Sequence, residues 1–335
     1  MLKKLLSLSL LLSLSVEAEQ SLPAKLVADS ILLDIIAISD TQYLAVGERG
    51  HVITGQSLTD FTQIIVPTTA SLTAVAQVNQ KLWAVGHDYT IIHSDDNGQT
   101  WQTQFTDISK ERPLLDVVFF DEQQGIAIGA YGSFMRTIDG GSTWQTELHA
   151  SLLHPDDIEY LEEVREFDGE AFYLEELESI LPHLNRVFYS GNQLYMAGES
   201  GMLAQSNDLG ATWQRIDINY EGSFFDIIAI DDVLVAAGLR GNLFIRQGAE
   251  QWTSVDLCHT SSINSLFINN DKIVALSNNG YVANIDYTNL SSQPTCSDPA
   301  INVVHNADKI TIINAITFNN MSIAVTSDGL AQLTE

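Results

Sequence analysis

Three aspartates of the chain each occur in the same eight-residue pattern, Ser/Thr-x-Asp-x-Gly-x-Thr-Trp. A carboxylate fixed in a turn can bind a metal ion or exchange a proton with a substrate. It can instead accept the backbone N–H groups of its own turn, where the glycine supplies a positive φ. We interpret this pattern, the Asp-box, as a structural turn whose tryptophan packs between neighbouring sheets. Its three copies contain Asp96, Gly98 and Trp101, then Asp139, Gly141 and Trp144, then Asp208, Gly210 and Trp213.

No other motif in the sequence is typical of a catalytic or metal site. The chain has no Gly-x-Ser-x-Gly elbow, no P-loop and no His-Glu-x-x-His motif. Its eight histidines are scattered without the spacing of metal ligands. We therefore expect no catalytic residue, no metal and no cofactor.

The charge of the chain limits the classes of partner. Asp and Glu number 43 against 15 Lys and Arg, which gives a formal net charge of −28. Such a surface repels nucleic acids and anionic membranes. We expect a monomer that neither binds nucleic acid nor inserts into a membrane. The acidity favours solubility or attraction for a basic protein surface.

Residues 1–18 have the three regions of a secretory signal peptide. Lys3 and Lys4 precede an apolar run over residues 5–16, and residues 16–18 match a small-x-small cleavage site. The run is shorter than the about 20 residues that a membrane-spanning helix needs. We expect the remaining chain, 19–335, to be periplasmic or secreted. In an oxidising compartment Cys258 and Cys296 are candidates for a disulfide, with free thiols as the alternative.

A second pattern, an apolar pair followed by Gly-x-x-Gly and another apolar pair, recurs seven times with some departures. Its second glycine, or the residue in that place, is Gly50, Tyr89, Gly132, Gly201, Gly241, Gly280 and Gly329. Most steps are about 40 residues, the period of a four-stranded propeller blade. We predict an all-β, seven-bladed β-propeller with four-stranded blades. A six- or eight-bladed propeller and a β-helix solenoid are the alternatives.

The seventh unit has only three predicted strands, and a fourth is available from the other end of the chain. Residues Ala24–Val27 lie where an outer strand would precede the first inner strand. We predict that this N-terminal strand completes the last blade and removes an exposed sheet edge.

The step from Gly132 to Gly201 is too long and contains an insertion of roughly 30–35 residues. The extra residues, 149–183, contain eleven acids and one base, Arg165. Apolar residues at helical spacing predict two short amphipathic helices broken near Gly169. The helices either pack on the rim with their acids solvated or dock a basic partner. The spacing of an EF-hand is missing, so we do not expect bound Ca²⁺. The candidate docking acids are Asp156, Asp157, Glu162 and Glu163.

The seven units with their Asp-boxes resemble the photosystem II stability/assembly factor family and its bacterial relatives, which overlap with bacterial neuraminidase (BNR) repeat proteins. The resemblance rests on residues 97–101, 140–144 and 209–213 and on the Gly-x-x-Gly turns, and it covers residues 24–335 apart from the insertion. It implies a non-enzymatic chaperone that, in photosynthetic members, binds a membrane-protein subunit through a basic patch. Arg49 and Arg240 occupy two of the matching turns here, whereas the other turns contain no base.

The resemblance favours an exported, non-catalytic scaffold or assembly factor for an envelope or membrane complex. Arg49, Arg240 and the acidic insertion are the candidate partner-binding residues. The alternative is a sialidase-like enzyme or glycan binder, because sialidases also contain Asp-boxes. A sialidase is expected to contain an Arg-Ile/Leu-Pro segment and an arginine cluster for the substrate carboxylate. No arginine of this chain precedes Ile/Leu-Pro, so we favour the scaffold.

Overall fold

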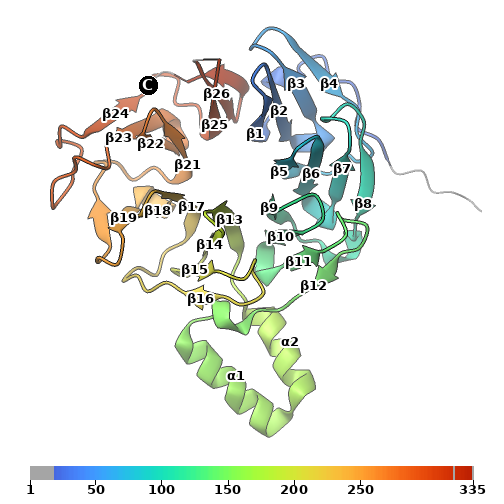
Figure 1. Cartoon of the computed structure of the whole chain (residues 1–335), viewed down its shortest axis with the longest axis vertical. Coiled ribbons are helices and arrows are strands. Elements are labelled where there is room, and N and C mark those ends of the chain that lie inside the picture. The colour runs from blue at the N-terminus through green and yellow to red at the C-terminus, as the bar shows by residue number, and fades with distance from the viewer. Residues whose placement is uncertain (1–18, 320, 334–335) are drawn as a thin grey trace, which may run out of the picture.

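The computed structural model describes residues 19–319 and 321–333, so the predicted signal peptide lies outside the described residues. Seven antiparallel sheets stand around a central opening, and a pair of helices projects from the rim (Figure 1). The fold is the predicted seven-bladed β-propeller. Among the described residues six sheets have four strands and the seventh has three.

The blades follow one another in chain order, each built outward from a strand beside the opening (Figure 1). Blade 1 is β1 (Leu32–Ser39), β2 (Gln42–Gly47), β3 (Val52–Gly55) and β4 (Phe61–Ile64). Blade 2 is β5 (Leu72–Val78), β6 (Lys81–Gly86), β7 (Ile91–Ser94) and β8 (Gln102–Phe105). Blade 3 is β9 (Leu114–Phe119), β10 (Gly125–Gly129), β11 (Phe134–Thr137) and β12 (Gln145–Thr146). Blade 4 is β13 (Leu184–Ser190), β14 (Gln193–Gly198), β15 (Leu203–Ser206) and β16 (Gln214–Arg215).

The remaining blades have the same order. Blade 5 is β17 (Phe224–Ile230), β18 (Val233–Gly238), β19 (Leu243–Gln247) and β20 (Thr253–Val255). Blade 6 is β21 (Ile263–Asn269), β22 (Lys272–Ser277), β23 (Tyr281–Ile285) and β24 (Ile301–His305). Blade 7 is β25 (Ile312–Phe318), β26 (Met321–Thr326) and β27 (Gly329–Gln332).

The second strand of a blade is apolar along most of its length because a neighbouring blade covers each of its faces. In β2, Leu44 and Val46 pack against blade 2, while Tyr43 and Ala45 pack against blade 7. Full burial of a Leu- or Val-sized side chain contributes about 1.5–3 kcal/mol. The core is therefore a ring of layers between blades.

A β-bulge near the start of each inner strand brings two successive side chains to the channel. The register between the first and second strands shifts there in every blade, as between Leu32 and Asp34 in blade 1. The bulge adds one residue to the inner strand, and both Leu33 and Asp34 line the channel. Each blade thus presents a first and a second bulge residue.

The N-terminal segment takes the place predicted for a fourth strand of blade 7, but its conformation corrects that prediction. Val27–Asp29 form a 3-10 turn, η1, that contacts β27. The approach is close at Gly329, which has a φ of +99°, and a Cβ there would lie 1.8 Å from the carbonyl oxygen of Ala28.

Hydrogen bonds to blade 1 explain why this segment is not a strand. The amide of Ser21 donates to the carbonyl of Val66, and the amide of Val66 donates to the Ser21 hydroxyl. The amide of Ala24 donates to Oε1 of Gln63 over 2.8 Å. Because these backbone groups bond to blade 1, residues 21–29 form a strap from blade 1 to β27 in place of a ladder. We call them the N-terminal strap.

The insertion forms a helical hairpin of α1 (Pro155–Asp168) and α2 (Glu170–Ile180), joined at Gly169, which has a φ of +90°. Leu161 and Leu177 join the core cluster of blades 3 and 4. Phe167 and Phe172 have the expected helical spacing but are 80% and 58% exposed. The hairpin therefore packs on the rim by one side and projects from it.

A disulfide joins Cys258 to Cys296. Cys258 follows β20 of blade 5, and Cys296 lies in the long loop between β23 and β24 of blade 6. An isolated bridge between Asp256 and Thr295 lies beside it. The disulfide thus ties the outer edges of two neighbouring blades.

Candidate functional site

The three Asp-box carboxylates are engaged within their own turns. Oδ1 of Asp208 accepts from the amide of Thr212 over 2.9 Å, and Oδ2 accepts from the Thr212 hydroxyl over 2.6 Å. Asp96 and Asp139 make the same two bonds. The Thr212 bonds, with one from Ser206, lower the pKa of Asp208 to about 2. Carboxylates held in this way stay ionised and stabilise the turn.

The glycine and tryptophan of each Asp-box connect neighbouring blades. A Cβ on Gly98 in blade 2 would lie 2.7 Å from Cδ1 of Leu44 in blade 1. Trp213 packs in the cluster that also holds Ile126 and Phe134 of blade 3. The Asp-boxes therefore hold neighbouring blades together, and we expect a binding site among other residues.

Arg49 and Arg240 lie at the tips of equivalent turns, each between the second and third strands of its blade. Their φ values of 55° and 58° place both in the left-handed region. Both side chains are exposed, and Arg49 lies 3.9 Å from Glu48. Blades 1 and 5 are not neighbours in the ring, so the two arginines are not brought together in a patch.

Asp156, Asp157, Glu162 and Glu163 are all exposed on α1. The only Lys or Arg of the insertion, Arg165, is used internally. Its guanidinium stacks 3.6 Å from the centre of the Tyr173 ring and pairs with Glu162 and Glu170. The solvent side of α1 is thus strongly acidic.

The channel contains a feature that sequence reasoning missed, a closed ring of hydrogen bonds that we call the girdle. In blades 1, 3 and 5 the second bulge residue is an aspartate, and its carboxylate accepts an amide of the next blade. Asp34 accepts from Val75, Asp116 from Val187 and Asp226 from Leu266, at 2.7–2.8 Å. Each aspartate also accepts from the amide that follows it in its own strand.

Blades 2, 4 and 6 use the first bulge residue instead, and there the side chain donates. Thr73 donates to the carbonyl of Leu114, Asn185 to that of Phe224 and Asn264 to that of Ile312, each at 2.7 Å. Acceptors and donors thus alternate around the channel.

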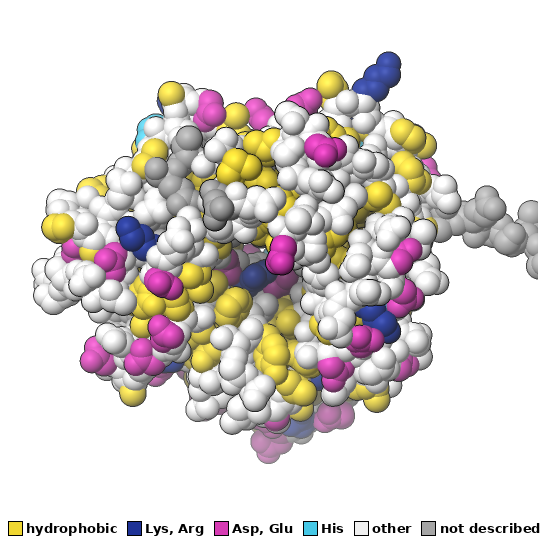
Figure 2. Space-filling view, turned by 45° about the horizontal axis from the view of Figure 1, so that its top comes forward, with side chains coloured by type: hydrophobic (Ala, Val, Ile, Leu, Met, Phe, Trp, Pro, Cys, Tyr) yellow, Lys and Arg dark blue, Asp and Glu magenta, His cyan; other side chains and the backbone are white. Residues whose placement is uncertain are grey.

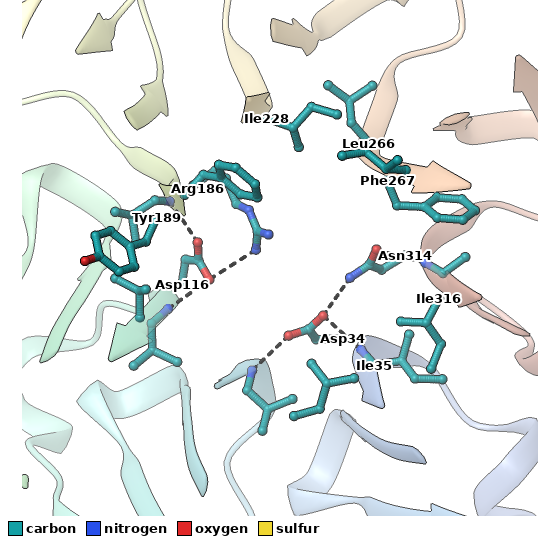
Figure 3. Close-up of a pocket in the computed structure, with 18 of the residues that line it drawn as sticks. Asp34, Ile35, Asp116, Arg186, Tyr189, Ile228, Leu266, Phe267, Asn314 and Ile316 are labelled. Atoms are coloured by element: carbon teal, nitrogen blue, oxygen red, sulfur yellow. Dashed lines mark hydrogen bonds and ion pairs between the residues drawn. The ribbon is translucent and has the colours of Figure 1, made fainter. Parts of the chain in front are cut away.

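Seven blades cannot alternate evenly, and blades 7 and 1 are both of the acceptor kind. By analogy with blades 1, 3 and 5, blade 7 would accept a hydrogen bond from the amide of Ile35 in blade 1. That amide already donates to Asp34. Asn314 resolves this because its Nδ2 donates to Oδ1 of Asp34 over 2.7 Å (Figure 3). Every junction between blades therefore has a side-chain hydrogen bond beside the channel.

The girdle also concentrates charge. Arg186 lies between two of its carboxylates, with Nη1 3.4 Å from Asp116 and Nε 3.2 Å from Asp226. Burial raises the pKa of Asp34 and of Asp226 to about 6, although Arg186 and the amide bonds act in the opposite direction. Burial also raises the pKa of Asp116. A signal for the girdle was present in the sequence, namely the polar residues that recur in the opening strands of the repeats.

A cavity of about 470 Å³, which we call the chamber, lies in the channel next to the girdle and is lined in part by its residues. Its wall includes residues two positions beyond the second bulge residues, and these are all apolar. They are Ile36, Val118, Phe188, Ile228, Phe267 and Ile316. Figure 2 shows charged side chains of both signs at the bottom of a central hollow with hydrophobic side chains around it.

Within residues 19–319 and 321–333, no group of three or more His, Cys, Asp and Glu side chains is arranged to hold a metal ion. No helix in this same part of the chain is long and apolar enough to cross a membrane.

Comparison with solved structures relates the architecture to known propellers. The structure of YCF48 bound to D1 peptide matches 95% of this chain and 97% of its own, with a TM-score of 0.65 and 12% identity. The chain has the fold of YCF48. YCF48 from Cyanidioschyzon merolae gives a TM-score of 0.64 at 14% identity, over 93% of this chain and 97% of its own. The WD40 propeller of Doa1 gives 0.63 at 13% identity, over 94% of each chain.

Sequence comparison supports the same resemblance over a short stretch. The photosystem II assembly protein Ycf48 of Synechococcus sp. (strain JA-2-3B'a(2-13)) is 31% identical over 72 residues. The match spans 22% of this chain and 22% of that relative's length. No protein-family model matches the chain.

Proposed function

We propose that this protein is an exported, non-catalytic propeller that binds another protein and assists assembly of an envelope or membrane complex. The observation that supports it most directly is the fold shared with YCF48, of which one solved structure holds a D1 peptide. The Ycf48 name of the 72-residue match agrees with a role in assembly. Export is proposed from the signal-peptide pattern of residues 1–18.

Two exposed regions are the candidate contacts of this scaffold. The acidic side of α1 suits a basic protein surface, since its four candidate carboxylates are exposed and its single Lys or Arg is paired internally. Arg49 and Arg240 extend from separate blades and suit single acidic groups of a partner. Because rim charges mainly set association rate and salt dependence, contact through α1 should weaken as ionic strength rises.

The first test is made in the organism that encodes the chain. Deleting the gene should lower the amount of one assembled envelope complex on native gels, and the wild-type gene should restore it. Fractionation should place the protein outside the cytoplasm. Unchanged complexes together with a cytoplasmic protein would refute the proposal. Turnover of fluorogenic sialosides or other glycosides, lost on mutation of a channel carboxylate, would favour the glycosidase alternative.

The contact through α1 is tested with charge variants, because deletion of the hairpin would remove Leu161 and Leu177 and expose the core of blades 3 and 4 that they cover. Neutralising Asp156, Asp157, Glu162 and Glu163 to Asn or Gln should reduce binding of the identified subunit about tenfold or more at low salt. The matched control neutralises four exposed acids elsewhere, Asp40, Glu250, Asp271 and Asp308. Equal binding by the two variants would rule out docking through α1.

A further inference from the structure

The channel has an amphipathic interior with two levels. At one level the girdle presents carboxylates, amides and hydroxyls to a space of about 120 Å³. At the next level the larger chamber has the apolar wall of Ile36, Val118, Phe188, Phe267 and Ile316. A molecule that fills both levels needs an apolar body and a polar head.

The charge at the girdle selects the kind of head. Three carboxylates line the channel there, with Arg186 as the one basic side chain among the lining residues. The guanidinium contacts Asp116 and Asp226. Asp34 is bonded to neutral donors and makes no ion pair with any residue that the structure describes. Figure 3 shows Asp34 and Asn314 across the opening from Arg186 and Asp116.

One polar group at this level, the hydroxyl of Ser265, lacks a hydrogen-bond partner within the described chain. Ser265 is the second bulge residue of blade 6, lines the girdle space and is 8% exposed. A buried hydroxyl without a partner costs about 1–3 kcal/mol, and a ligand that bonds to it would recover that cost. Blade 7, which contains Asn314, lies between blade 6 and blade 1, which contains Asp34.

We propose that the channel is a binding site for a primary ammonium group on an aliphatic chain, with the ammonium at Asp34 and Ser265 and the chain in the apolar chamber. An ammonium has three donors and no acceptor, which suits a carboxylate and a hydroxyl oxygen. Its positive charge compensates the excess of carboxylates over guanidinium. This site is separate from α1 and from the turn arginines, so it goes beyond the proposed scaffold function.

The test uses the full exported chain and isothermal titration at pH 8 with three probes of equal length, n-hexylammonium, n-hexanol and hexanoate. Hexylammonium should bind about tenfold more tightly than hexanol, which corresponds to about 1.4 kcal/mol, and hexanoate should bind least. Equal affinity for the amine and the alcohol, or no saturable binding of the amine, would overturn the proposal.

Three variants locate the binding. Asp34→Asn should reduce hexylammonium affinity to that of hexanol, whereas Asp271→Asn, an exposed acid outside the channel, should change nothing. Val118→Phe places a ring in the chamber and leaves the girdle charges intact, so it should abolish binding of both probes. Binding that persists in a folded Val118→Phe protein would place the site elsewhere and refute the proposal, even if Asp34→Asn does not fold.

The ammonium has two possible sources, a free alkylamine or a lysine side chain of a bound protein. Nα-acetyl-lysine methylamide distinguishes them, because its backbone must remain outside the chamber mouth. Binding as tight as that of hexylammonium assigns the site to lysine, and much weaker binding assigns it to a free amine.

Discussion

At the scale of single residues, Asn314 stands out because its amide has a task that a carboxylate cannot perform. Its Oδ1 accepts the amide of Ala315 like the aspartates of other blades, and its Nδ2 donates to Asp34. A carboxylate at this position would face that of Asp34 without a proton between them. When two carboxylates lie within hydrogen-bond distance in a buried site, the pKa of one of them is strongly raised.

Asn314→Asp should therefore lower the free energy of unfolding by about 2–4 kcal/mol at pH 8. The loss should shrink at pH 5, because one proton shared by the pair restores the hydrogen bond. Urea unfolding at the two pH values measures this difference. Asn302→Asp, at an exposed position of β24, is the control. A loss in Asn314→Asp that does not depend on pH would contradict the explanation.

The girdle carboxylates also predict how the wild-type protein responds to pH. The pKa of Asp34 and of Asp226 rises from 3.8 to about 6 on folding because both are buried. Between these values the folded state binds more protons than the unfolded state, so stability falls as the pH rises through this window. Each group can contribute up to about 3 kcal/mol.

The Asp-box acts in the opposite direction at lower pH. The depressed pKa of Asp208, about 2, contributes stability that is lost as the pH falls below 3.8. Urea unfolding from pH 3 to pH 8 should therefore show maximal stability near pH ~4. Asp34→Asn should flatten the decline above the maximum, and parallel profiles for the two proteins would argue against the girdle as its cause.

At the scale of elements, the two helices of the insertion differ from an independent hairpin because one side of them belongs to the propeller core. Two leucines on α2 provide a matched comparison. Leu177 is 2% exposed in the cluster of blades 3 and 4, whereas Leu174 is 45% exposed. Both side chains are leucines on the same helix, so the comparison isolates the effect of burial.

Leu177→Ala should lower the free energy of unfolding by about 2–4 kcal/mol, and Leu174→Ala by less than about 1 kcal/mol. Thermal and urea unfolding of the two variants measure the difference. Equal effects would mean that the hairpin does not pack on the rim in solution.

The elements also show what the sequence could and could not predict. The Gly-x-x-Gly turns and the Asp-boxes are local, since each is complete within about eight residues, and their period gave the number of blades. The girdle is a set of contacts between residues about 40 positions apart, such as Asp34 with Val75. Except for the pair of Asn314 and Asp34, each polar side chain of the girdle bonds to a backbone amide or carbonyl of the next blade, and residue type does not reveal such a partner.

The strap failed as a predicted strand for a related reason. Apolar residues over 24–27 indicated the position beside the last blade, which is where the segment lies. Its conformation depends on Gln63 and Val66 of blade 1, contacts that the local sequence does not specify. A propensity argument could find the location and miss the hydrogen-bond partners.

At the scale of the whole molecule, the strap joins the two ends of the described ring, in addition to the girdle and to the packing of β2 against blade 7. It bonds to blade 1 at Ser21 and Ala24 and contacts β27 of blade 7. Ala28 and Gly329 approach each other closely in that contact, since a Cβ on Gly329 would meet the carbonyl oxygen of Ala28. Opening of the propeller should therefore begin between blades 7 and 1 when this contact is weakened.

Gly329→Ala tests this, because a Cβ there would lie 1.8 Å from the carbonyl oxygen of Ala28. Gly191→Ala is the control, since Gly191 also has a positive φ and its Cβ would meet nothing within 4 Å. Both substitutions strain the backbone by about 1 kcal/mol. Only Gly329→Ala should speed hydrogen exchange in β25–β27, while exchange in β9–β12 stays unchanged. Uniform acceleration across all blades would contradict a weak point at this junction.

The alternation of the girdle has a consequence for how such a ring can gain or lose blades. A ring with an even number of blades could repeat the acceptor–donor pair without a mismatch, whereas an odd ring must contain one junction of like kind, here that of Asn314 with Asp34. With blades 1 and 7 kept, duplication or deletion of a single blade would change this parity and create a second junction of like kind. Insertion or removal of two adjacent blades would preserve it. Designed size variants of this propeller should therefore be made in steps of two blades.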